Sequence, residues 1–216
     1  MPAPRLAVLA SGTGSLFSAL VAAAGAGRLP ADVVALVTDR DCAALDLAAR
    51  SGVAAAVVRP RDFADRTAWD GALADHLADL DVEWVVSAGF MRILGPAVLA
   101  GFPDRVVNTH PALLPSFPGA HAVRDALAHG VRVSGCTVHL VDEGTDTGPV
   151  LAQAAVPVLD DDDEATLHER IKVVERDLLV DVLAGLVTGG VVVEGRRTRW
   201  RPAPGRTSAP AATPAR

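Results

Sequence analysis

The chain has 216 residues and a formal net charge of −6, and its composition is 50% apolar but only 4% aromatic. This length and apolar content suit one large domain or two small ones, whereas the acidic balance and scarce aromatic rings argue against non-specific binding to nucleic acid or anionic membranes. No run of about 18 apolar residues predicts a transmembrane helix, and the first residues lack the layout of a signal peptide, so we expect a cytoplasmic protein whose partners are small molecules.

The first half of the sequence alternates between strand-like and helix-like runs. Short apolar runs predict strands over residues 5–10, 32–38, 54–58, 83–90 and 105–108. The intervening patterns predict helices over residues 15–27, 42–52 and 67–80, the first two ending in glycine as helices often do. This alternation predicts an α/β fold in which a doubly wound, mostly parallel sheet carries helices on both faces.

The second half has a different pattern. Two predicted strands, 134–141 and 149–158, are separated by a short loop that suits an antiparallel pair, so the sheet is expected to be mixed. A long helix is predicted over residues 163–188, with an apolar stripe at Leu167, Ile171, Val174, Leu178 and Val182. We interpret the acidic run 160–164 as a helix N-cap with favourable charge, in preference to a metal site. Residues 1–200 are expected to form one domain, and the Pro- and Arg-rich residues 201–216 a disordered tail.

The pentapeptide SGTGS, residues 11–15, joins the first predicted strand to the first predicted helix. Its glycines allow a tight turn and a close approach to a ligand, and the amides at the start of the helix favour an anion. Because position 17 is Phe, the loop matches neither G-x-G-x-x-G nor the nucleoside-triphosphate loop. The loop therefore indicates a phosphate monoester; the alternative is an ordinary tight turn between strand and helix.

The stretch NTHPALLPSFPG, residues 108–119, is the strongest candidate for a catalytic segment. Asn108 and His110 point to one side if the preceding strand continues that far, and they then lie at the carboxyl end of a strand, where open α/β sheets bind ligands. An amide donates to a developing oxyanion, and a histidine exchanges protons near neutral pH. Three prolines after His110 restrict the loop and lower the entropy of holding the pair in place.

A carboxylate near His110 would orient the imidazole and favour its protonated form. The loop VDEGTDTGPV offers Asp146, with Asp142 and Glu143 as competitors. Asp146 has a glycine two residues to either side, which gives it a modest preference.

The remaining histidines and the two cysteines carry little functional signal. The histidines lack ligand spacing, and His139 is expected to be packed within its strand. Cys42 and Cys136 are far apart and form no C-x-x-C motif, so we expect two buried thiols, with neither a disulfide framework nor a zinc site. No metal cofactor is expected.

Taken together, these motifs resemble one enzyme family. The matching segments are SGTGS (11–15), SAGFMRIL (87–94), NTHPALLPSFPG (108–119), DEGTDTGP (142–149) and the helix that contains Glu175. In this order they resemble the phosphoribosylglycinamide formyltransferases, the folate-dependent transformylases of purine biosynthesis, over about residues 5–195. The resemblance implies the formyltransferase fold, with a Rossmann-like N-terminal half that binds the ribonucleotide phosphate and a C-terminal half that binds folate and carries the catalytic residues.

The resemblance also implies a reaction. The amino group of glycinamide ribonucleotide attacks the formyl carbon of 10-formyltetrahydrofolate, and the tetrahedral intermediate collapses to release tetrahydrofolate, with no metal and no covalent enzyme intermediate. His110 is the implied proton donor, Asn108 binds the formyl oxygen, and Asp146 supports the imidazole and orders a water for proton transfer. A homodimer is compatible with the sequence.

Substrate-binding residues follow from the same match. The implied ribonucleotide site comprises Gly12, Thr13, Gly14, Ser15, Leu16 and Glu175. The implied folate site comprises Arg66, Met91, Arg92, Ile93, Leu94, Asn108, Asp142 and Asp146. Ile171 and Leu179 lie four residues to either side of Glu175 and place it on an apolar ridge, where a carboxylate needs a partner; the alternative is a surface ion pair with Lys172.

Two positions depart from the family pattern. Leu16 stands where the family commonly has Asn, which removes an amide donor near the phosphate, and Arg176 stands where many relatives have His.

We weigh three alternative functions. Methionyl-tRNA formyltransferase would need a C-terminal RNA-binding domain, and formyltetrahydrofolate deformylase an N-terminal regulatory domain; the sequence is expected to contain neither. A non-catalytic nucleotide-binding module would explain SGTGS but not Asn108, His110 and Asp146 together.

Overall fold

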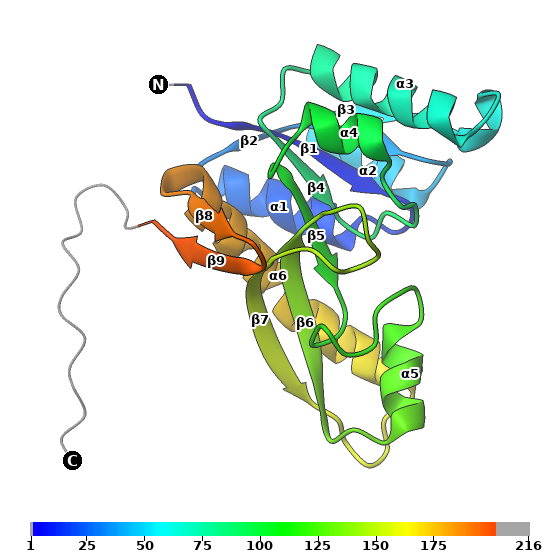
Figure 1. Ribbon diagram of the computed structural model, residues 1–216, viewed down its shortest axis with the longest axis vertical. Coiled ribbons are helices and arrows are strands. Elements are labelled where there is room, and N and C mark those ends of the chain that lie inside the picture. The colour runs from blue at the N-terminus through cyan, green and yellow to red at the C-terminus, as the bar shows by residue number, and fades with distance from the viewer. Residues whose placement is uncertain (1, 202–216) are drawn as a thin grey trace.

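The computed structural model describes residues 2–201, which form a seven-stranded sheet and a separate two-stranded hairpin (Figure 1). The strand order in the large sheet is β3-β2-β1-β4-β5-β6-β7. Neighbours from β3 to β5 run parallel, whereas β6 is antiparallel to both β5 and β7. The strands of this sheet are β1 (Arg5–Ala10), β2 (Asp32–Thr38), β3 (Ala54–Val57), β4 (Trp84–Ser87), β5 (Val106–His110), β6 (Val133–Leu140) and β7 (Val150–Pro157). The predicted mixed, mostly parallel sheet is therefore confirmed.

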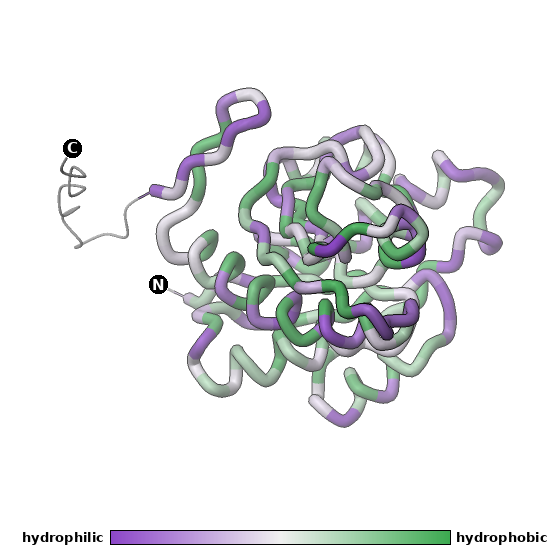
Figure 2. The backbone as a smooth tube through the Cα atoms, turned by 90° about the horizontal axis from the view of Figure 1, so that it is seen from below, coloured by the Kyte–Doolittle hydropathy of each residue, from purple (hydrophilic) through white to green (hydrophobic). Residues whose placement is uncertain are grey.

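Helices cover both faces of the sheet, because each β-α-β crossover places its helix on one side (Figure 1). The helices are α1 (Ser15–Gly25), α2 (Ala43–Ser51), α3 (Arg66–Asp79), α4 (Pro96–Gly101), α5 (Ala122–His129) and α6 (Glu164–Thr188), with a short 3-10 turn at Pro60–Asp62. One apolar core joins α1, α2 and α6 to the sheet, and a second core joins α3 and α4 to the opposite face. The apolar segments thus lie inside the molecule, and hydrophilic ones gather toward its outside (Figure 2).

The long helix α6 begins where the acidic run predicts an N-cap. The Asp163 carboxylate accepts the amide of Thr166, and the Thr166 hydroxyl accepts the amide of Asp163, which forms a complete capping box. The preceding Asp162 accepts two hydrogen bonds from Arg170, at 2.6 and 2.7 Å. In the described part of the chain, no three His, Cys, Asp or Glu residues are placed to share a metal ion.

Several predicted boundaries are wrong, for local reasons. The strand expected over residues 83–90 ends at Ser87, because Gly89 takes a left-handed conformation with φ of 72° and the chain turns away. Conversely, the strand expected to end at residue 108 continues to His110, since β6 pairs with it through His110 and Thr137. The sequence patterns also did not predict the short α4 or the hairpin of β8 (Val191–Glu194) and β9 (Arg197–Trp200), which projects from the body of the molecule (Figure 2). The tail predicted over residues 201–216 lies, from residue 202 on, outside the described residues.

The order of the strands determines where a ligand site forms. The chain moves outward from β1 to β3, then returns to the other side of β1 with β4 and β5. This reversal leaves a crevice at the carboxyl ends of β1 and β4, the position at which open α/β sheets bind ligands. Among residues 2–201, no helix is both long enough and apolar enough to cross a membrane.

Candidate active site

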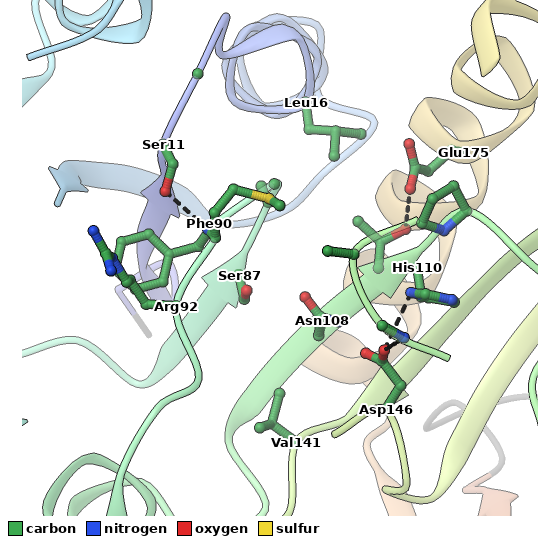
Figure 3. A pocket seen from close by; sticks show the side chains of 18 of the residues that line it. Ser11, Leu16, Ser87, Phe90, Arg92, Asn108, His110, Val141, Asp146 and Glu175 are labelled. Atoms are coloured by element: carbon green, nitrogen blue, oxygen red, sulfur yellow. Dashed lines mark hydrogen bonds and ion pairs between the residues drawn. The ribbon is translucent and has the colours of Figure 1, made fainter. Parts of the chain in front are cut away.

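A cavity of about 600 Å³ opens at this crevice, along the carboxyl ends of β1, β4 and β5 (Figure 3). Its walls come from segments that are distant in sequence: the loop 11–16, the segment 87–94, the end of β5, the loop 144–146 and one face of α6. Most residues of the two predicted substrate sites lie in these walls. The exceptions are Arg66 and Asp142, which do not line the cavity.

The end of β5 presents side chains to both sides of the sheet. Asn108 and His110 point to one side, as expected when a strand continues through both, and Thr109 points to the other. His110 is buried, while Asn108 is half-buried and faces the cavity (Figure 3). Pro111 ends the strand directly after His110, so the pair is fixed by the sheet on one side and by a stiff loop on the other.

Both ring nitrogens of His110 face oxygen atoms. Nε2 lies 2.8 Å from the carbonyl oxygen of Phe117, and Nδ1 lies 3.4 Å from Oδ2 of Asp146. A carbonyl and a carboxylate only accept hydrogen bonds, so a proton on either ring nitrogen has an acceptor within reach. His110 thus lies between the loop after β5 and Asp146, in the wall of the cavity.

Asp146 connects the loop after β6 to the loop after β5. Its Oδ2 accepts the amide of Gly119 at 2.8 Å, and its Oδ1 lies 3.7 Å from Nε2 of His139. Burial raises the pKa of Asp146, but the contacts with His139, the Gly119 amide and His110 lower it by more, so the pKa of this carboxyl lies below its ordinary value. The carboxylate stays ionised beside the two imidazoles.

His139 makes a polar contact that the sequence patterns did not predict. We expected this strand histidine to be merely packed; it is buried, but its Nε2 lies 3.1 Å from Nδ2 of Asn108. Its Nδ1 lies 2.8 Å from the carbonyl oxygen of Leu140. Residues 108 and 139 face each other across the β5–β6 pair, and only that long-range pairing brings them together.

The glycine loop forms the opposite rim of the cavity. Gly14 is the N-cap of α1, with φ of 74° and no side chain capping the helix, so the first amides of α1 face the cavity side without a side-chain partner. A side chain at Gly14 would place Cβ 2.8 Å from that of Ala44, which explains the glycine. Leu16 is buried and contributes apolar surface to the wall.

Two residues of α6 that were not among the predicted site residues, His168 and Lys172, also line the cavity. Lys172 donates to Glu169 at 2.7 Å, three residues earlier on the helix. Burial, followed by the nearby charge of Lys172, lowers the pKa of His168. The sequence could have indicated both residues as part of the site, because the spacing of four residues between them places them on the helix face that also carries Glu175.

Glu175 is buried and has one hydrogen-bond partner in the described structure, the hydroxyl of Thr109, at 2.7 Å (Figure 3). The alternative of a surface ion pair with Lys172 is wrong, because Lys172 pairs with Glu169. Burial raises the pKa of Glu175, and the hydrogen bond from Thr109 offsets only part of this effect. A buried carboxylate with one hydrogen-bond partner is stabilised by any further hydrogen-bond donor that a ligand brings.

The segment 90–94 forms the third wall, with the large side chains of Met91 and Ile93 exposed. The Met91 amide donates to the hydroxyl of Ser11 at 2.8 Å. Arg66, which starts α3, donates a hydrogen bond to the carbonyl of Ile93 and so acts on this wall from behind. The Asp142 carboxylate accepts within its own loop, from the Gly144 amide and the Thr147 hydroxyl.

Neither cysteine belongs to the cavity wall. Both are free thiols; Cys136 is buried as expected, but Cys42 is only half-buried. Burial raises the pKa of Cys136 to about 12, so its thiol stays protonated and unreactive.

Comparison with known proteins gives one family. Residues 4–183 match the family model described as formyl transferase. The phosphoribosylglycinamide formyltransferase of Mycobacterium tuberculosis is 60% identical over 192 residues, which cover 89% of each chain. The crystal structure of glycinamide ribonucleotide transformylase 1 from Symbiobacterium toebii has a TM-score of 0.91 and 42% identity, and the match covers 93% of this chain and 95% of that one. A formyltetrahydrofolate deformylase from Pseudomonas syringae shares the fold, with a TM-score of 0.86 at 22% identity over 93% of this chain and 67% of that one.

Proposed function

Because the chain belongs to the formyl transferase family, we propose that it transfers the formyl group of 10-formyltetrahydrofolate to the amino group of glycinamide ribonucleotide. The products are formylglycinamide ribonucleotide and tetrahydrofolate, in purine biosynthesis. The relative that is 60% identical carries the name of this activity.

One observation supports the proposal most directly. Asn108, His110 and Asp146 meet on one wall of a cavity whose two other walls suit two different ligands (Figure 3). A catalytic pair between two binding walls is the arrangement that group transfer between two substrates requires.

We assign the ribonucleotide to the side formed by the glycine loop and α6. The phosphate would accept from the first amides of α1, where the helix dipole favours an anion. Lys172, on the facing helix, supplies the positive charge that compensates for the amide lost at Leu16. Glu175 would accept a hydrogen bond from a ribose hydroxyl, which relieves its burial beside Thr109.

We assign the folate to the side formed by residues 90–94 and the loop 144–146. The exposed apolar side chains of Met91 and Ile93 provide contact surface for the pterin and benzoyl rings. Arg66, placed behind Ile93, fixes the backbone of this wall, and Asp142 fixes the fold of its own loop. Residues 1–200 would thus act as one domain, with the phosphate bound by its N-terminal half.

The chemistry follows from the positions of the polar groups. The substrate amine attacks the formyl carbon and forms a C–N bond, and the formyl oxygen becomes an oxyanion. Asn108 and His110, which both line the cavity, would donate to that oxygen. Collapse breaks the bond between carbon and N10 of the folate, and the proton lost by the amine reaches N10 through His110 or a water beside Asp146.

Asp146 and His139 keep this arrangement in place. The Asp146 carboxylate, ionised because its pKa is low, stabilises positive charge on His110. His139, with Nε2 at 3.1 Å from Nδ2 of Asn108, would hold one amide hydrogen and leave the other free to point at the formyl oxygen. No step requires a metal ion. The two free thiols are as expected in a reducing compartment, and we propose a cytoplasmic location.

The test is a two-substrate assay with purified protein that follows release of tetrahydrofolate. Release that requires glycinamide ribonucleotide is the expected result. Release without the ribonucleotide would show a deformylase, and no release under either condition would refute the proposal in favour of a binding module.

A further inference from the structure

We propose that Asp39 is a positioning residue for the folate wall, residues 90–94: it fixes the side chain of Arg92 beside Ser11, at the start of the glycine loop. Asp39 itself does not line the cavity, so it acts through Arg92, which does. The contacts of Asp39 do not depend on the proposed function, but the predicted change in the KM for the folate rests on that function.

The position of Asp39 follows from the strand order. It comes directly after β2, and β2, β1 and β4 are neighbours in the sheet. Their carboxyl ends therefore deliver Asp39, Ser11 and the segment 88–92 to adjacent places (Figure 3 shows Ser11 beside Arg92). The Asp39 side chain has 0% exposure, so this carboxylate is placed where only protein groups reach it.

Two arginines share the Asp39 carboxylate. Arg92 donates from Nε to Oδ2 at 2.7 Å, and Arg40 donates to Oδ1 and Oδ2 at 3.0 and 2.8 Å. Arg40 follows Asp39 in the chain, whereas Arg92 lies 53 residues further on, so only the contact with Arg92 links two separate segments. A charge-assisted hydrogen bond to a buried carboxylate fixes the orientation of the partner side chain.

Ser11 lies at the same place. Its hydroxyl accepts the Met91 amide at 2.8 Å, and its own amide donates to the Gly89 carbonyl at 3.1 Å. Ser11 is also one of the groups that lower the pKa of the Asp39 carboxylate, so the two side chains lie close together. Asp39 therefore fixes the Arg92 side chain directly, next to the Ser11 hydroxyl that holds the Met91 backbone.

This link is permanent across the physiological pH range. Burial raises the pKa of Asp39, but the hydrogen bonds from Arg40 and Arg92, with a contribution from Ser11, lower it to about 2. Asp39 is therefore a fixed structural charge and not a pH-dependent switch.

The test compares Asp39→Asn with Asp41→Asn. Asp41 also pairs with an arginine, Arg59, at 2.6 Å, but its side chain is 73% exposed and it lies outside the cavity wall, so it is a matched control. Asp39→Asn keeps the shape of the side chain and removes its charge. We expect the KM for 10-formyltetrahydrofolate to rise about tenfold or more, with a smaller change in kcat, because charge-assisted hydrogen bonds that orient the wall are lost. Asp41→Asn should leave both constants unchanged.

Amide hydrogen exchange provides the readout that a merely stabilising residue would not change. In Asp39→Asn, peptides covering residues 88–95 should exchange at least about tenfold faster while peptides from β6 do not, because local opening and global unfolding differ in free energy. Unchanged exchange at residues 88–95, or kinetics equal to those of Asp41→Asn, would overturn the inference. Exchange also separates the two proposals: if the wild-type enzyme transfers no formyl group, the proposed function fails, but the exchange result still decides the role of Asp39.

A second variant tests the same contact in case Asp39→Asn does not fold. In Arg92→Gln the buried carboxylate keeps its two hydrogen bonds from Arg40, so the fold is expected to persist. Faster exchange at residues 88–95 is again expected, and its absence would contradict the role assigned to the Asp39–Arg92 pair. If Asp39→Asn folds, the two substitutions together should raise the folate KM by less than the product of their separate effects, because both break the same contact.

Discussion

Replacement of Asp146 by Asn tests the electrostatic part of the mechanism most cleanly. Asp146 has φ of 55°, a left-handed conformation that Asn tolerates and most residues do not, so the substitution removes the charge with little backbone strain. The Gly119 amide still finds a side-chain oxygen to donate to. Only the negative charge near His110 and His139 is lost.

The size of the effect follows from the distances. At 3.4 Å from His110 and an effective dielectric constant of about 20, a unit charge pair interacts by roughly 5 kcal/mol, which sets an upper limit. The net contribution of a charge-assisted hydrogen bond, after desolvation, is about 1.5–3 kcal/mol. A loss of this size in the transition state lowers kcat by about 10- to 150-fold.

The assay is initial-rate measurement of tetrahydrofolate release with both substrates saturating. Glu143→Gln is the matched control, because Glu143 is an exposed acid of the same loop that does not line the cavity, and its kcat should stay near the wild-type value. A kcat for Asp146→Asn within about twofold of wild type would refute the idea that Asp146 supports a charged His110. An equal loss in both variants would show that the loop needs net negative charge and not this particular carboxylate.

The same variant predicts a pH dependence of stability. The folded-state pKa of Asp146 lies below its ordinary value, so its stabilising contribution is present above that ordinary value and is lost only as the pH falls through the lower folded-state value. The difference in Tm between wild type and Asp146→Asn should therefore persist at pH 5 and shrink below pH 4. A difference that disappears already at pH 6 would contradict the lowered pKa.

Three further changes test the remaining assignments. His110→Ala should leave the fold and ribonucleotide binding largely intact while kcat falls by at least about 10²-fold, the usual scale for general acid–base catalysis, and near-normal turnover would exclude His110 from the mechanism. Ser15→Asp places a negative charge at the start of α1, so the KM for the ribonucleotide should rise far more than that for the folate, and equal increases would contradict the position of the phosphate. Glu175→Gln removes a buried carboxyl whose pKa is raised in the folded state, so that its ionised form destabilises the fold. Thermal scans should therefore show a Tm a few degrees above that of wild type at pH 7.5, and this gain should disappear below the ordinary pKa of glutamate, while the KM for the ribonucleotide rises. A lower Tm at neutral pH would show that the ionised carboxylate stabilises the fold.

The sequence by itself determined the local features of this protein. Strands and helices up to α3, and the long α6, follow from apolar periodicity and from glycines or caps at their ends, which are properties of neighbouring residues. The candidate catalytic residues were visible for the same reason, since Asn108 and His110 stand two residues apart in a segment with three prolines. Asp146 was favoured over Asp142 only modestly from the sequence, yet in the structure it is Asp146 that faces both imidazoles.

Errors at element boundaries arose where pairing with another strand overrode local preference. β5 continues to His110 because β6 supplies hydrogen-bond partners from 27 or more residues away, and no pattern within residues 105–110 contains that information. The hairpin of β8 and β9 was missed because the side chain of Trp200 packs against Gly185 of α6, a contact that depends on where the long helix ends.

Only the tertiary structure decided which polar residues act together. His139 meets Asn108 through antiparallel strand pairing, Lys172 reaches the cavity through the position of α6, and Asp39 meets Arg92 because β2, β1 and β4 are neighbours in the sheet. In sequence these partners are separated by 31 residues for Asn108 and His139 and by 53 for Asp39 and Arg92. Their contacts come from the order of the strands and from the packing of helices on the sheet. Both arrangements bury apolar surface contributed by the whole chain, so no single segment of the sequence encodes them.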